Sequence, residues 1–323
     1  MSKSKKTGKQ KKKYTSIGGQ ALIEGIMMRG PLKTAMAVRT PEGEIALEEV
    51  ECKSPSDRPS IFKIPLLRGI YAFVESMILG SKTLMRSAEL AGEEDEEEEL
   101  TPFEKKLNDI FGDKLFNIIM TVAMVIGVAV AILLFFVVPS AVYSGIAMLV
   151  PALNGNLVFR SIFEGVFKIV LFILYIFLCT RMKEMHRVFE YHGAEHKTIF
   201  CYEAKEELTV ENVRKFKRFH PRCGTSFLII MLILGIVLGL CIQVETVWIR
   251  TIIRLCCLPL VMGIGYEIIR FCGKHDNLLT KILSAPGMWM QHITTFEPAD
   301  DQIECAIAAI KAVIPENTEG EIV

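Results

Sequence analysis

Long apolar segments are the feature that most constrains how this chain of 323 residues can fold. A helix of about 20 apolar residues crosses the hydrocarbon core of a bilayer. Four segments are long and apolar enough to do so, namely 115–138, 159–179, 227–244 and 247–269. We therefore predict a mainly α, polytopic membrane protein with about four transmembrane helices, joined to cytoplasmic α+β segments.

Few charged residues interrupt these segments. The second carries Arg160 at its edge and, further in, Glu164 and Lys168, which are spaced four residues apart and can pair on one helix face. The fourth carries Arg250 and Arg254 near its start and Glu267 near its end. A buried helical hairpin in a soluble core is the alternative for the last two segments. Eighteen successive uncharged residues in the third segment favour the membrane instead.

The charged residues come in blocks, although 37 basic and 37 acidic residues balance overall. Seven lysines lie among the first thirteen residues, and seven consecutive acidic residues occupy 93–99. Together with the apolar segments, this pattern excludes an ordinary soluble domain, a disordered chain and a collagen-like chain. Nine cysteines, an odd number with four of them in apolar segments, exclude a secreted disulfide scaffold and predict reduced thiols.

The distribution of Lys and Arg predicts the topology, because cytoplasmic loops are enriched in both. Of the 37 basic residues, 33 lie in 1–114, 181–225 and 270–323. We therefore predict a multi-pass protein of the cell (plasma) membrane with both termini in the cytoplasm. The connection 140–158 and the turn 243–246 would face the other side.

Shifts in composition divide the chain into five regions. We predict a disordered basic tail (1–16), a cytoplasmic segment (17–92), an acidic linker (93–114), a membrane domain (115–270) with a cytoplasmic loop (181–225), and a cytoplasmic C-terminal segment (271–323). The basic tail suits anionic lipid better than nucleic acid.

Shorter elements are also expected in the cytoplasmic regions. Within 17–92 we expect a β-hairpin of 34–38 and 44–51 and an amphipathic helix at 66–90. Asp300 and Asp301, which precede 302–313, predict a C-terminal helix there. The glycines of 18–31 match neither a phosphate-binding loop nor a dinucleotide fingerprint.

The most informative motif is His-x-x-Glu-His, formed by His192, Glu195 and His196. If the second span continues as a helix, the two histidines lie one turn apart on one face and can bind one metal ion. Glu195 lies beside them and is a candidate general base, as in the inverted zincin motif. A polar helix end capped by histidines near lipid head groups is the alternative.

A tetrahedral ion needs further ligands. His220 and Cys223 flank a turn that Pro221 and Gly224 favour, so both can reach one ion. Glu267 is the alternative third ligand, unless it pairs with the nearby Arg270. Two further residues, His275 and Asp276, are reserve candidates, whereas His186 and His292 are expected on the surface.

Several motifs in order carry a resemblance to a known family. They are GGQALIEGIMMRG (18–30), EYHGAEHKTIFCYE (190–203), HPRCGTSF (220–227), GYEIIR (265–270) and ITTFEPADDQIECAI (293–307). Together they resemble the YqhQ-like family of bacterial integral membrane proteins, whose function is unknown and which are described as predicted metal-dependent enzymes. The similarity to inverted-zincin peptidases, which are soluble α/β proteins, covers only five residues.

Three functions fit these features. The first is a metal-dependent enzyme of the hydrolase type, with Zn²⁺ as the expected divalent ion and a lipid-linked or membrane-protein substrate. The second is a membrane adaptor in which His192, His196, His220 and Cys223 close a structural site. The third, a transporter, is the least favoured, since the chain has no evident internal repeat. The expected partner is the lipid bilayer, with no nucleic acid.

Overall fold

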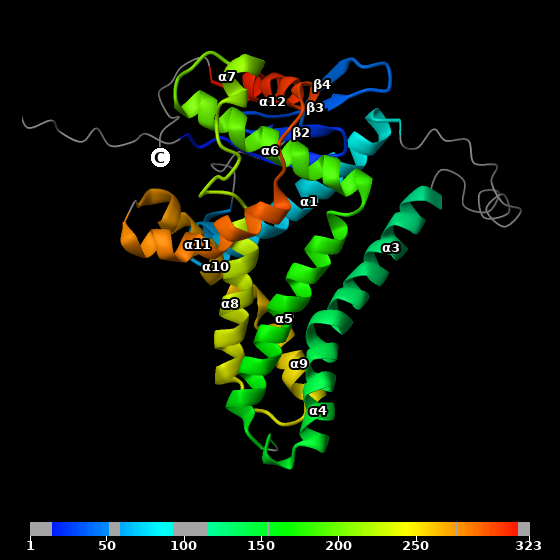
Figure 1. The fold of residues 1–323 in the computed structure, drawn as a ribbon, viewed down its shortest axis with the longest axis vertical. Coiled ribbons are helices and arrows are strands. Elements are labelled where there is room, and N and C mark those ends of the chain that lie inside the picture. Colours follow the sequence, from blue (N-terminus) through cyan, green and yellow to red (C-terminus); the bar gives the residue numbers. More distant parts are fainter. Residues whose placement is uncertain (1–14, 52–58, 93–114, 154, 276, 316–323) are drawn as a thin grey trace, which may run out of the picture.

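The computed structural model describes residues 15–51, 59–92, 115–153, 155–275 and 277–315 (Figure 1). Most of the predicted basic tail and the whole acidic linker lie outside these residues, as does the reserve candidate Asp276. Four strands open the described chain: β1 (Gly18–Leu22), β2 (Gly25–Arg29), β3 (Thr34–Arg39) and β4 (Ile45–Glu49).

Helices make up most of the rest. They are η2 (Ser60–Lys63), α1 (Leu67–Leu90), α3 (Leu115–Ile132), η4 (Leu133–Val137), α4 (Val138–Leu149), η5 (Pro151–Leu153), α5 (Leu157–Cys179), α6 (Lys183–Glu203), α7 (Val210–Arg214), α8 (Thr225–Cys241), α9 (Val247–Cys256), α10 (Leu258–Lys274), α11 (Leu278–Thr294) and α12 (Asp300–Val313). Figure 1 shows a broad cap, built from the sheet with α1, α6, α7 and α12, above a narrow shaft of α3, α4, α5, α8 and α9.

The four strands form one antiparallel sheet in the order β1-β2-β3-β4. The predicted hairpin is confirmed as β3 and β4, with Gly43 in the turn at φ 85°. The same segment extends further than expected, because 18–29 forms a second hairpin, β1 and β2. The prediction of a lone hairpin therefore missed half of the sheet.

Both faces of the sheet are covered, which explains why the interior residues of its central strands are apolar on both faces. Side chains alternate between the faces of a strand. On β2, Ile26 and Met28 pack with α6 and α12, whereas Met27 packs on the opposite face with Leu79 of α1. The predicted amphipathic helix and the predicted C-terminal helix are thereby confirmed as α1 and α12, one on each face.

The number of transmembrane helices differs from the prediction. Two helices of the described chain are long and apolar enough to cross a membrane: Thr121–Leu149, which runs through α3, η4 and α4, and Leu157–Cys179, which is α5. Helices α9 and α10 add a third only if they are taken as one span bent by 45°. The prediction of four transmembrane helices is therefore wrong for the described residues, in which two helices, or up to three, could cross a membrane by length and composition.

The physical reasons lie in helix length and in one proline. The 17 residues of α8 rise only ~26 Å, less than the ~30 Å hydrocarbon core. Pro259 lies in the first turn of α10, where its missing N–H and its ring end the preceding helix. The predicted outer connection 140–158 is also mostly helical, because α4 continues the first span through the π-helical turn η4.

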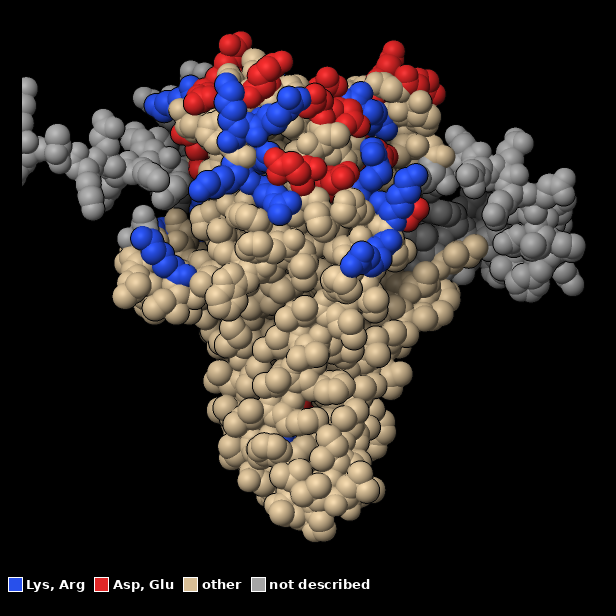
Figure 2. All heavy atoms as spheres, in the orientation of Figure 1, with Lys and Arg blue, Asp and Glu red and all other residues tan. Residues whose placement is uncertain are grey.

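Charged side chains are distributed unevenly over the molecule. In the view of Figure 2, Lys, Arg, Asp and Glu gather on the cap, and the shaft shows an almost unbroken surface of other residues. Large apolar side chains of the shaft are exposed on α3 and α5, for example Val125 and Leu178. Such a surface is typical of a segment that faces lipid.

Candidate metal centre

Helix α6 carries the predicted motif inside the cap. It is separate from α5, because residues 180–182 interrupt the helix between Cys179 and Lys183. Tyr191 and Ala194 bury one face of α6 against the sheet and α12. His192 and His196 follow one turn apart, and the centroids of their rings are 4.4 Å apart.

Cys223 completes a group of three donors. It lies in the turn before α8, in which the Cys223 amide donates to the carbonyl oxygen of His220 at 3.3 Å. Its Sγ atom is 3.1 Å from Nε2 of His192. The donor atoms of His192, His196 and Cys223 all lie within 4.8 Å of one another. Tetrahedral zinc ligands are about 3.5 Å apart, so this group fits an ion after movements of about an ångström.

Backbone carbonyl groups orient both imidazole rings. Nδ1 of His192 is 2.7 Å from the carbonyl oxygen of Thr294, and Nδ1 of His196 bonds the carbonyl oxygen of Arg218. A carbonyl oxygen only accepts, so each Nδ1 must carry the proton. Each Nε2 therefore presents its lone pair to the donor group, which is the usual arrangement of metal-binding histidines.

The Nε2 atom of His196, which faces the donor group, has no hydrogen-bond partner among the described residues. The side chain is 1% exposed. A buried acceptor without a partner costs about 1–3 kcal/mol, so such atoms are rare unless an ion or a ligand fills the position. The unpaired Nε2 therefore fits a site for a metal ion.

A glycine allows the Thr294 carbonyl to reach His192. The chain after α11 runs against α6, and the amide of Phe296 donates to the carbonyl oxygen of Phe189 at 2.9 Å. A Cβ atom on Gly193 would come within 2.0 Å of the carbonyl oxygen of Phe296. Only glycine therefore permits this close approach, which brings the end of α11 to the motif.

Glu195 lines a cavity of about 470 Å³, together with His196 and Cys223. The carboxylate is buried and accepts a hydrogen bond from the backbone of Gly19 in β1. Burial raises the pKa of Glu195 above its ordinary value, although His192 and the Gly19 amide oppose the shift. A raised carboxyl pKa is typical of a group that exchanges protons near neutral pH.

His220 lies next to the three donors but is not one of them. Its ring centroid is 5.5 Å from that of His196, and its Nδ1 accepts from the Arg222 amide at 3.3 Å. Gln291 of α11 holds the His220 backbone through two hydrogen bonds of 2.7 and 2.8 Å. Burial, His196 and Arg222 lower the pKa of His220 to about 2, so the imidazole is neutral.

The structure places the other candidates away from the donor group. The Glu267 carboxylate pairs with Arg68 of α1, with Nε to Oε1 at 2.6 Å. His275 is exposed and stacks on Phe271. The two histidines expected on the surface, His186 and His292, are partly exposed or exposed and stack on Phe296 and Phe219.

Sequence reasoning missed the groups that orient the site. Gly193, Gly19 and the carbonyl groups of Arg218 and Thr294 are all part of it. Gly193 lies inside the motif. A glycine in the interior of a helix often indicates that another chain segment packs closely against it, so the sequence contained a signal for this contact. The two carbonyl groups carry no signal, because every residue has one.

Comparison with known proteins places the chain in a family. Residues 64–316 match the family described as "Protein of unknown function (DUF1385)". The chain is also 35% identical over 310 residues to "Uncharacterized protein YqhQ" of Bacillus subtilis (strain 168), covering 93% of this chain and 92% of that protein. The chain belongs to this family of unknown function. No solved structure matches it.

The YqhQ-like resemblance of the sequence motifs is thus confirmed at the level of the family. The matched range contains all three donors and Glu195. It begins after β4, so the sheet that supplies Gly19 to the cavity lies outside it. The match with the Bacillus protein spans 93% of the chain.

Proposed function

We propose that this protein is a metal-dependent enzyme of the hydrolase type, with its site facing the cytoplasm beside the membrane surface. One observation carries the proposal: the donor atoms of His192, His196 and Cys223 converge, and His196 and Cys223 line a cavity that Glu195 also lines. Three protein ligands beside an open space are typical of catalytic zinc sites, whereas structural sites have four.

Each residue has a definite part in this proposal. His192, His196 and Cys223 hold the ion, and the carbonyl groups of Thr294 and Arg218 fix the two rings. Zinc held by these residues would supply Lewis-acid chemistry that lowers the pKa of a coordinated water to about 7. Glu195 would be the general base, a role for which its raised pKa is suited.

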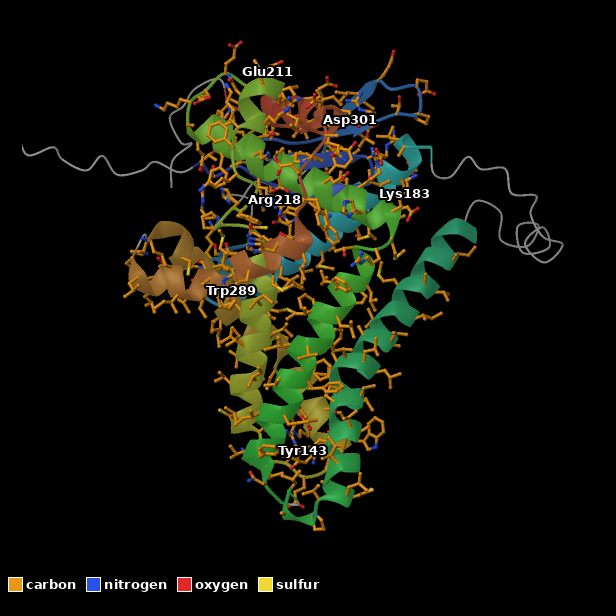
Figure 3. All side chains as sticks on the ribbon, in the orientation of Figure 1. Tyr143, Lys183, Glu211, Arg218, Trp289 and Asp301 are labelled. Atoms are coloured by element: carbon orange, nitrogen blue, oxygen red, sulfur yellow. The ribbon has the colours of Figure 1, made fainter. Side chains whose placement is uncertain are left out.

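The surroundings of the cavity support a substrate at the membrane surface. The cavity lies where the cap meets the shaft, and Arg270 and Lys274 at the end of α10 contribute positive charge to its wall. Helix α11 crosses this level and exposes apolar side chains, including Trp289 at 73% (Figure 3). Exposed Trp is enriched where membranes meet water. A lipid-linked or membrane-protein substrate with an anionic group fits this wall.

The proposal includes the topology, with the cap in the cytoplasm and the turn around Gly155 on the other side. The blocks of Lys and Arg support it. A single cysteine at Gly155, in a chain whose own cysteines are replaced by serine or alanine, should react with an impermeant maleimide in intact cells. Reaction only after permeabilisation would reverse the orientation.

The decisive experiment separates Glu195 from the ligands. Glu195→Gln keeps the size of the side chain but cannot accept a proton. The variant should therefore retain zinc and lose function by about 10²–10⁴-fold. His192→Ala combined with His196→Ala should lose zinc and function together. Zinc content of the purified protein and complementation of a deletion strain are the two measurements.

His275→Ala is the matched control, because His275 is an exposed histidine outside the donor group. It should retain both zinc and complementation. Full complementation by Glu195→Gln with zinc bound would refute the enzyme and favour an adaptor with a structural ion. Stoichiometric zinc in the double histidine variant would refute the metal centre itself.

A further inference from the structure

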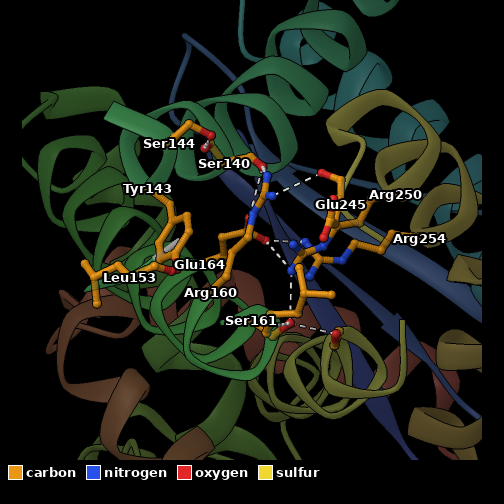
Figure 4. Close-up of polar contacts among 12 residues, drawn as sticks. Ser140, Tyr143, Ser144, Leu153, Arg160, Ser161, Glu164, Glu245, Arg250 and Arg254 are labelled. Carbon is orange, nitrogen blue, oxygen red and sulfur yellow. Dashed lines mark hydrogen bonds and ion pairs between the residues drawn. The ribbon is translucent and has the colours of Figure 1, made fainter. Parts of the chain in front are cut away.

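A second cluster of charged side chains lies inside the shaft, and Figure 4 shows its polar contacts. It lies toward the end remote from the cap, because Arg160 is over the ring of Tyr143, which Figure 3 labels near that end. Glu164 of α5 forms ion pairs with three arginines. Arg160 approaches it at 2.9 Å, Arg254 at 2.6 Å and Arg250 at 3.1 Å. Each of these four residues is less than a tenth exposed.

The cluster has an excess of positive charge. One carboxylate faces three guanidinium groups, and the remaining hydrogen bonds go to neutral groups. These are the hydroxyl groups of Ser140 and Ser161 and the backbone carbonyl oxygen of Glu245. Uncompensated charge in an apolar region is costly and commonly marks a functional site.

Donors remain unused as well. In the described part of the chain, Nε and Nη1 of Arg250 and Nε of Arg254 are buried without an acceptor. Gly239 makes room for Arg254, since a Cβ atom there would lie 2.8 Å from its Nη2 atom. The cluster therefore has unused donors and an uncompensated charge, both of which one further anion would satisfy.

An apolar cavity of about 270 Å³ opens beside this cluster, between η4, α5, α8 and α10. Arg254 and Ser161 belong to both the cluster and the cavity wall. Lys168 adds a second positive charge to the wall, with its Nζ 4.5 Å from the ring centroid of Phe136. Most of the other lining side chains are hydrocarbon, such as Phe172 and Ile236. The volume is near the lower end of ligand pockets, which is about 300 Å³.

We propose that this cavity binds an anionic amphiphile, with its head group at Arg254 and Lys168 and its hydrocarbon chain against the apolar wall. The charge excess requires an anion, and the wall requires a hydrocarbon chain. A fatty carboxylate and a lipid phosphate share this chemistry. The site is separate from the metal centre, since Arg160 and Glu164 lie near the opposite end of α5 from α6.

The test uses the full chain in nanodiscs of zwitterionic phosphatidylcholine. Equilibrium binding is measured for radiolabelled dodecanoate, dodecyl phosphate and dodecanol, with empty nanodiscs subtracted. At least one of the two anions should bind at one site per chain and at least tenfold more tightly than dodecanol. The anion that binds more tightly identifies the source of the head group.

Two variants address the two halves of the site. Arg254→Gln removes the head-group partner and should weaken binding of the anion at least tenfold. Gly235→Leu leaves every charge in place and fills the cavity, because Gly235 lines it and a Cβ atom there meets nothing within 4 Å. Gly235→Leu should also weaken binding at least tenfold. It tests the proposal even if Arg254→Gln fails to fold.

Gly127→Leu is the matched control, as a Cβ atom there also meets nothing within 4 Å, and Gly127 lies on α3 outside the cavity wall. Its binding should stay within twofold of the wild type. Dodecanol binding as tightly as both anions would overturn the proposal. Unchanged anion binding by folded Arg254→Gln or by Gly235→Leu would overturn it too.

Discussion

Gly193→Ala tests whether the close approach of two chain segments supports the metal centre. A Cβ atom would lie 2.0 Å from the carbonyl oxygen of Phe296 and 3.2 Å from its carbonyl carbon. The obstacle is backbone, so the segment must move by more than an ångström. That segment follows Thr294, whose carbonyl group holds the ring of His192 at 2.7 Å.

Two opposing effects set the magnitude. Replacing Gly by Ala inside a helix stabilises it by about 1 kcal/mol. Overpacking a buried contact costs about 1–3 kcal/mol. The displaced backbone also loses the hydrogen bond to His192, and losing such support weakens metal binding about 10–100-fold. We therefore expect a net loss of stability together with weaker zinc binding.

The assay combines thermal unfolding with zinc titration of the purified protein. Gly145→Ala on α4 is the control, because a Cβ atom there meets nothing within 4 Å. The control should unfold at or slightly above the wild-type temperature and bind zinc equally well. If Gly193→Ala behaves like this control in both measurements, the supporting role of the Thr294 segment is refuted.

Two further predictions concern groups outside the donor set. Burial raises the pKa of the Cys305 thiol to about 11, from 9.0. The unfolded chain then loses this proton first, so stability is full below pH 9 and falls by up to about 1.4 kcal/mol per pH unit toward pH 11. Cys305→Ala should flatten this alkaline slope in unfolding curves recorded from pH 8 to 11, and an unchanged slope would contradict the assignment. Glu267 is held by Arg68, so Glu267→Gln should leave the zinc content unchanged. It should cost about 1 kcal/mol or less, since the pair is partly exposed. Loss of zinc from this variant would return Glu267 to the ligand set.

Local patterns in the sequence were sufficient for several elements. The hairpin of β3 and β4 follows from alternation around a Pro-Glu-Gly turn, and α12 follows from its acidic first turn. The spacing of His192 and His196 places both on one face of any helix. These features depend only on the geometry of neighbouring residues, so a single sequence contains them.

Hydropathy alone did not predict the number of helices that can cross a membrane. Segment 227–244 is apolar, yet its helix α8 ends at Cys241, and segment 247–269 bends by 45° before Pro259. Within the shaft, Arg250 and Arg254 turn inward to Glu164. Hydropathy measures the free energy of transferring side chains to lipid. It does not specify where a helix ends or bends, and it does not reveal that a buried charge has a partner on another helix.

Some residues of the candidate site could be predicted from the sequence, whereas others were identified only in the tertiary structure. His192, Glu195 and His196 were identifiable because they stand together in the chain. Choosing Cys223 over His220 or Glu267 as the third donor required the fold, since Arg222 and Arg68 engage the other two. The carbonyl groups of Arg218 and Thr294 reach the imidazole rings through contacts 22 and 102 residues apart in sequence. The spacing of residues along the chain determines the relative directions of side chains only within one helix or strand. The distance between elements is determined by packing, here by the contact that Gly193 permits.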